Sequence, residues 1–98
     1  MPEMTFEVRW PDGSTQCCYS PSLVMHDYLQ TGANYTVAEF LDRSRRALAD
    51  AGARVRAKYG FACTSAVDTR ERITLAANRF PLDALIEITA MRPELEQS

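Results

Sequence analysis

The stretch TVAEFLDRSRRALADAGARVRAKYG, residues 36–60, decides the fold, because it carries the pattern of a long amphipathic helix. Thr36 followed by Glu39 fits a capping box, in which the two side chains accept backbone N–H groups of the first turn. Apolar and small residues recur at steps of three and four and form one stripe on a 3.6-residue period: Val37, Phe40, Leu41, Ser44, Leu48, Ala51, Val55 and Tyr59. Gly60 supplies a left-handed stop. We therefore predict a helix over residues 36–60.

The opposite side of this helix is charged. Acidic residues precede basic ones by four positions, an order worth about 0.2–0.5 kcal/mol per pair, in Glu39–Arg43, Asp42–Arg46 and Asp50–Arg54. Gly52 disagrees with the pattern, since glycine costs about 1 kcal/mol relative to alanine inside a helix. It is either a tolerated weak position or a point where another backbone approaches closely.

Before the helix, residues 4–10 alternate apolar and polar side chains, which predicts a strand with one buried face. Pro11-Asp12-Gly13 is typical of a turn, and residues 14–20 read as the returning strand of a hairpin. A three-residue loop places Phe6 opposite Cys18, with Cys18 inward and Cys17 outward. A four-residue loop would exchange the two cysteines. We predict the three-residue loop.

The remaining elements complete a β-β-(α)-α-α-β order. Ser20 and Pro21 are typical of a helix start, and an extended segment over residues 23–29 is the alternative. Residues 30–34 are predicted to be a loop. We expect Ser65 or Asp68 to cap a second helix that ends before Pro81. Residues 85–91 predict the last strand, and residues 94–98 a polar tail. The result is one α+β domain over residues 1–98, an antiparallel hairpin plus a C-terminal strand, with the first strand central and the helices on one face. Open edges and an uncovered face allow a homodimer as well as a monomer.

Composition excludes several classes of protein. The net charge of −2 and the pI of about 5.3 provide no global basic field, so we expect no nucleic-acid partner. No apolar run is long enough for a membrane span, and the first residues lack the pattern of a secretory signal. Three cysteines, two of them adjacent, do not make a disulfide framework. We therefore expect a cytoplasmic protein.

Cys63 is the side chain with the clearest chemical potential, because it precedes the second helix, where the helix dipole lowers a thiol pKa. The alternative is a small buried hydrophobic residue. The candidate ligand-binding residues are Trp10, Cys18, Tyr19, Tyr59, Cys63 and Ser65. His26, the only histidine, lies beside Asp27 and reads as a surface residue. No phosphate-binding loop, nucleophile elbow or catalytic carboxylate pair appears, so we predict no catalytic residue, metal ligand or cofactor.

Four segments carry a resemblance to a known family: VRWPDGS (8–14), CYSPSLV (18–24), residues 35–47, and RVRAKYGFACTSA (54–66). There the chain resembles small bacterial nitrogen-starvation-response proteins encoded in gene clusters with a nitrilase. The resemblance implies cluster partners: a radical-SAM enzyme, an acetyltransferase, an aminoimidazole-ribotide-synthase-like protein and a flavoprotein. It also implies a part in nitrile or cyanide nitrogen use, and it carries over no catalytic residue.

Two hypotheses follow for function. The first is a non-catalytic accessory or regulatory protein that acts by binding enzymes of the same cluster, or itself. The second is a small-molecule-binding or thiol-dependent protein that uses Cys63 at a helix N-terminus.

Overall fold

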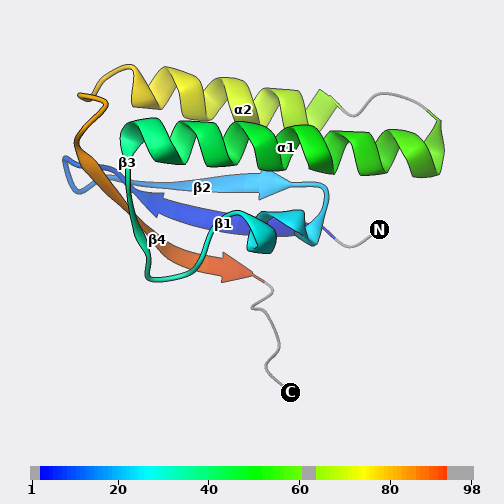
Figure 1. The fold of residues 1–98 in the computed structure, drawn as a ribbon, viewed down its shortest axis with the longest axis horizontal. Helices are drawn as coiled ribbons and strands as arrows, with labels where there is room; N and C mark the ends of the chain where they lie inside the picture. The colour runs from blue at the N-terminus through cyan, green and yellow to red at the C-terminus, as the bar shows by residue number, and fades with distance from the viewer. Residues whose placement is uncertain (1–2, 61–63, 93–98) are drawn as a thin grey trace.

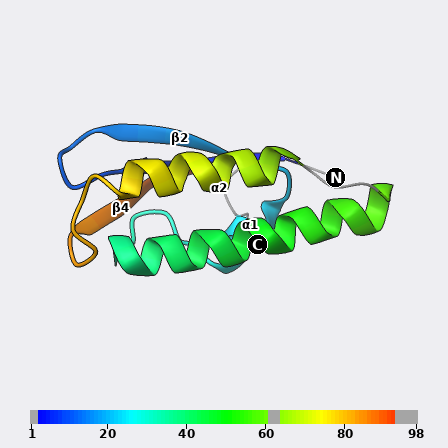
Figure 2. The same cartoon turned by 90° about the horizontal axis from the view of Figure 1, so that it is seen from above.

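The computed structural model describes residues 3–60 and 64–92, which form an antiparallel sheet with two helices on one face (Figure 1). The elements are β1 (Met4–Arg9), β2 (Thr15–Ser20), the 3₁₀ helix η1 (Leu23–Asp27), β3 (Asn34–Thr36), α1 (Val37–Tyr59), α2 (Thr64–Ala77) and β4 (Leu85–Arg92). The strand order is β2-β1-β4-β3. The predicted α+β architecture is confirmed, with β1 inside the sheet and the two helices side by side above it (Figures 1 and 2).

The turn between β1 and β2 has the predicted three-residue form. The backbone N–H of Trp10 donates to the carbonyl of Ser14 at 2.8 Å, and Gly13 has the positive φ of 89° that this turn requires. The Asp12 carboxylate accepts the Ser14 N–H at 3.0 Å and the Ser14 hydroxyl at 2.6 Å. These hydrogen bonds hold the pKa of Asp12 below its usual range, because they favour the charged carboxylate.

This turn sets the register of the hairpin. Phe6 lies opposite Cys18, as predicted. Cys18 is consequently buried on the covered face of the sheet, whereas Cys17 is exposed. The alternative register, in which the two cysteines exchange faces, is excluded.

Strand β3 is a correction to the prediction, which assigned residues 30–34 to a loop. Asn34, Tyr35 and Thr36 pair with β4, and Tyr35 lies opposite Ile86. A three-residue strand is too short to show a two-residue period, so its partner β4 defines it. Thr36 ends this strand and also caps α1, where its hydroxyl oxygen accepts the N–H of Glu39 at 3.1 Å.

Two predicted helix starts were wrong. Helix η1 begins after Ser22, whose hydroxyl accepts the Val24 N–H at 3.3 Å, while the Ser20 hydroxyl donates to the Ser22 carbonyl. Helix α2 already begins at Thr64, so neither Ser65 nor Asp68 is its cap. The Asp68 carboxylate instead forms an ion pair with Arg72, one helical turn later, at 2.9 Å.

The core lies between the helices and the covered face of the sheet. The predicted inward residues of β1 and its end, Met4, Phe6, Val8 and Trp10, are all buried. The indole of Trp10 lies between two rings, edge-on to Phe40 and stacked on Phe80, with a centroid distance of 5.6 Å to each. Most of the predicted stripe of α1 is buried as well: Val37, Phe40, Ser44, Leu48, Ala51 and Val55.

A β-bulge in β4 keeps the last strand's apolar residues on the core side. The register with β1 shifts between Glu7 and Val8, and Thr89 is the extra residue. Its hydroxyl donates to the Glu7 carboxylate at 2.7 Å. Because of this extra residue, Ile88 and Met91 both point into the core although they are an odd number of positions apart.

Helix α1 ends at Gly60, which has φ of 79° and donates its N–H to the Arg56 carbonyl at 2.7 Å. The C-terminal turns of α1 extend past the end of the sheet (Figure 1). Neither helix in residues 3–60 and 64–92 combines the length and apolar content needed to cross a bilayer.

Candidate functional site

Trp10 and Cys18, two of the predicted site residues, are core side chains on the covered face of the sheet. Each is 4% exposed. The Trp10 indole Nε1–H donates to the Gln16 side-chain carbonyl at 3.0 Å, and the Cys18 thiol lies 3.9 Å from the Gln16 backbone carbonyl. Burial, and secondarily the neighbouring Cys17, raises the pKa of the Cys18 thiol to about 12. Cys18 is therefore protonated near neutral pH and lacks the thiolate that reactive cysteines use.

The other predicted residues lie elsewhere. Tyr19 is on the uncovered face of the sheet, since successive strand residues point to opposite faces, and its hydroxyl donates to the Glu3 carboxylate at 2.8 Å. Ser65 lies in the first turn of α2. Tyr59 is the last residue of α1, and its side chain and Cys63 lie outside the described residues. The structure thus separates Tyr19 from Trp10 and Cys18, and the ligand-binding role of the set stays a prediction.

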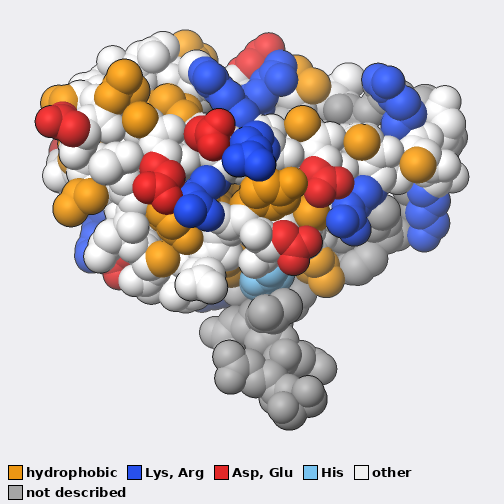
Figure 3. Space-filling model, viewed as in Figure 1, with side chains coloured by type: hydrophobic (Ala, Val, Ile, Leu, Met, Phe, Trp, Pro, Cys, Tyr) orange, Lys and Arg blue, Asp and Glu red, His pale blue; other side chains and the backbone are white. Residues whose placement is uncertain are grey.

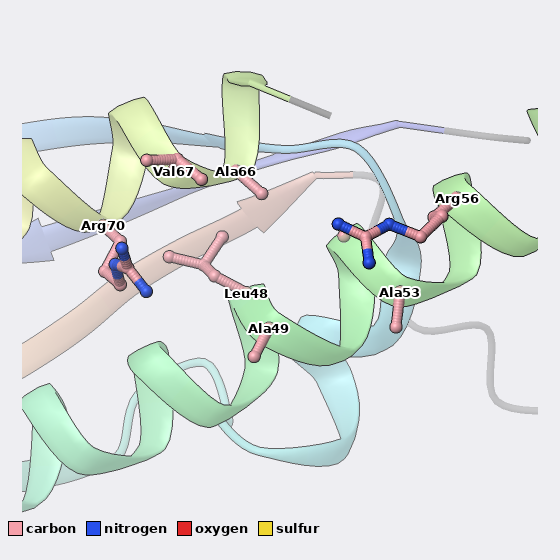
Figure 4. Close-up of a pocket in the computed structure, with 8 residues that line it drawn as sticks. Leu48, Ala49, Ala53, Arg56, Ala66, Val67 and Arg70 are labelled. Carbon is pink, nitrogen blue, oxygen red and sulfur yellow. The ribbon is translucent and has the colours of Figure 1, made fainter. Parts of the chain in front are cut away.

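The structure reveals a different feature, a hollow of about 240 Å³ between α1 and α2 (Figure 4). Its lining is aliphatic except for one arginine from each helix: Leu48, Ala49, Gly52, Ala53 and Arg56 from α1, and Ala66, Val67 and Arg70 from α2. A Cβ added at Gly52 would lie 3.9 Å from the Ala66 Cβ, which is ordinary van der Waals contact. The structure therefore supports a weak helix position at Gly52, not a close backbone approach.

A second, more open hollow of about 590 Å³ adjoins the first, because Arg70 lines both. Its other lining residues are Arg45, Glu71, Thr74 and Leu75. We call the two hollows together the helix groove. Two apolar side chains along α2 at this groove are exposed, Val67 at 44% and Leu75 at 70%. The groove thus offers apolar surface along both helices.

The charges around the helix groove differ from those on the rest of the helical layer. Acidic and basic side chains alternate on the face of the molecule in Figure 3. The three predicted pairs of α1 are all present, with N···O distances of 2.9, 3.5 and 3.1 Å. Arg45, Arg56 and Arg70, by contrast, form no ion pair with any residue in the described part of the chain. The groove therefore has cationic groups available for an anionic partner.

The comparisons with known proteins agree with the resemblance noted in the sequence. The family model for nitrogen starvation-induced protein NitG matches residues 5–91, which is nearly the whole chain and all of its sheet except the first residue of β1 and the last residue of β4. No curated protein and no solved structure matches the chain. The match spans both helices and therefore includes every residue that lines the helix groove. The chain therefore belongs to the family of nitrogen starvation-induced protein NitG.

Proposed function

We propose that this protein is a non-catalytic accessory protein of the nitrogen-starvation response that acts by binding a partner protein. The observation that carries the proposal is the helix groove, in which exposed apolar side chains lie beside three guanidinium groups that form no ion pair with any described residue. Apolar surface next to unpaired charge is typical of a binding surface, because both kinds of group gain from contact with a complementary protein.

The alternative function, a thiol-dependent protein, gains less support from the described residues. Cys18 is one of its candidate ligand-binding residues, yet its raised pKa keeps it in the unreactive thiol form. Trp10 is enclosed by Phe40 and Phe80 and presents little surface to a ligand. We therefore place function on the helical layer.

The partners that the family resemblance suggests are enzymes of the same gene cluster, among them the nitrilase, the radical-SAM enzyme and the acetyltransferase. A second copy bound groove to groove is disfavoured, because Arg45, Arg56 and Arg70 of the two copies would meet and repel one another. A cluster enzyme with an acidic surface would instead match the groove.

Direct binding to the purified cluster enzymes tests this proposal. Biolayer interferometry with the full chain immobilised should detect at least one enzyme with a Kd of about 1 μM or tighter. An unrelated acidic protein of similar size serves as the negative control. If every cluster enzyme fails to bind at about 100 μM, the accessory function is wrong.

A further inference from the structure

The size and shape of the helix groove point to an elongated occupant. The hollow of about 240 Å³ is smaller than the pockets of roughly 300–1,000 Å³ that hold drug-sized ligands, so it suits one or two side chains; the adjoining hollow of about 590 Å³ is within that range but is more open to solvent. The adjoining hollow extends it along both helices. Arg45 and Arg56 mark its two ends on α1, and eleven residues of helix correspond to about 16 Å. That length matches three turns of a helix laid along the groove.

The walls of the groove favour the apolar face of a helix. Val67 and Leu75 are exposed, and Leu48 and Ala66 form a buried floor between α1 and α2. The groove between two packed helices accepts the side-chain ridge of a third. Amphipathic helices bind such grooves through anchors at positions i, i+3, i+4 and i+7. Gly52, which has no side chain, leaves room for one of these anchors.

The charges of the groove determine whether the partner should be acidic or basic. The Arg56 side chain extends back along the groove toward the end where Arg70 lies (Figure 4). With Arg45 these groups place positive charge along the groove, and Glu71 is the one acidic residue among the described residues that line it. Nucleic acid suits this surface poorly, because the net charge is −2 and the walls are apolar. An acidic helix suits both the walls and the charge.

We infer that the helix groove binds an acidic amphipathic α-helix of the partner protein. This inference rests on the proposed function and deepens it, because it names the chemistry of the partner. The helix carries two acidic residues about eleven positions apart, which reach Arg45 and Arg56. Between them it presents aliphatic residues at helical spacing to Val67, Leu75 and the space above Gly52. A central acidic residue pairs with Arg70.

Synthetic peptides test this chemistry without the natural partner. The acidic probe is a helical peptide of about 18 residues, with glutamates at the stated spacing and leucines between them. A matched peptide carries lysine in place of each glutamate. In amide NMR spectra of the isotope-labelled full chain, the acidic peptide should shift Gly52, Ala66 and Val67 with a Kd below about 1 mM, and the lysine peptide should bind at least tenfold more weakly. No shift at about 1 mM acidic peptide, or equal binding of both peptides, overturns the inference.

Two double variants that lower the net charge by the same amount test the role of the guanidinium groups. The double variant Arg56→Gln/Arg70→Gln should weaken binding of the acidic peptide by about tenfold or more. The control Arg54→Gln/Arg72→Gln removes one arginine from each of the same helices, but these arginines are already paired with Asp50 and Asp68. It should retain binding within about twofold. Equal effects of the two double variants would show that net charge alone matters and would overturn the site.

Three further outcomes distinguish this inference from its rivals. Tighter binding of a short DNA duplex than of the acidic peptide would assign the groove to nucleic acid and overturn the inference. Amide NMR shifts of Gly52 and Ala66 on raising the concentration of the protein alone would assign the helix groove to a second copy of the chain and overturn the inference. If a cluster enzyme binds the chain but Arg56→Gln/Arg70→Gln has no effect, the groove is wrong while the accessory function stands. If the peptide binds and no cluster enzyme does, the accessory function is wrong while the groove chemistry stands.

Discussion

Replacing Gly52 by alanine should raise the free energy of unfolding by about 0.5–1 kcal/mol. Gly52 lies inside α1, and it is not among the glycines with positive φ. An added Cβ would meet the Ala66 Cβ at 3.9 Å, so the methyl group fits without a clash. The substitution therefore gains helix propensity and loses no native contact. For a domain of this size the gain corresponds to an increase in Tm of about 2–8 °C.

Gly60 provides the matched control for Gly52. It caps the same helix with φ of 79°, a conformation that costs a residue with a Cβ about 1–2 kcal/mol. Gly60→Ala should therefore lower the Tm, although nothing lies within 4 Å of its added Cβ. Alanine should thus raise the Tm at Gly52, where helix propensity decides, and lower it at Gly60, where the left-handed backbone conformation decides.

Thermal and urea unfolding of both variants, followed by far-UV circular dichroism, measures these changes. The m value should stay constant, since neither variant changes the surface exposed on unfolding. A lower Tm for Gly52→Ala would refute the reasoning, because it would mean that α2 approaches α1 more closely than the structure shows. Gly52→Ala should also weaken binding of the acidic peptide, since the added methyl group occupies the floor of the helix groove. A position that loses stability to keep a binding surface open would explain why glycine is found there.

Three other predictions concern the core, a cap and a thiol. Trp10→Ala should cost about 3–5 kcal/mol in urea unfolding, because the indole packs between Phe40 and Phe80; a loss of under about 1 kcal/mol would contradict this packing. Thr36→Ala should cost about 1 kcal/mol and Thr36→Ser much less, because only the hydroxyl caps α1; equal losses would show that the cap is not the cause. Iodoacetamide should modify Cys17 and spare Cys18 until the protein unfolds, as read by peptide mass spectrometry. Burial raises the pKa of Cys18 from 9.0 to about 12, so its contribution to stability is present below pH 9 and is lost as pH rises toward 12; rapid native modification of Cys18 would contradict its burial.

The helical layer and the sheet have different roles in this account. The core side of β1 and the rings around Trp10 hold the fold together. The buried polar side-chain atoms described there have hydrogen-bond partners within the protein. On the outward sides of α1 and α2, exposed apolar surface lies beside arginines that have no ion pair within residues 3–60 and 64–92. Binding through the helices would leave the sheet undisturbed, so replacing Arg56 and Arg70 in the groove should change affinity more than stability.

The sequence by itself determined the elements whose signals are local. Helix α1 was predicted with its cap at Thr36, its stop at Gly60 and its three ion pairs, because capping and i, i+4 contacts act within one or two turns. The hairpin turn at Gly13 likewise set the register that buries Cys18. The glycine at position 52 was also visible in the sequence as a departure from the helix pattern, and it lines the helix groove.

Only the tertiary structure decided the features that join distant parts of the chain. Strand β3 exists because β4 pairs with it, and the bulge at Thr89 exists because β4 must also match β1. The helix groove depends on α2 lying so that Arg70 and Val67 face the Gly52 side of α1. No local pattern specifies such a placement, because it follows from how both helices bury their apolar stripes on one sheet at the same time.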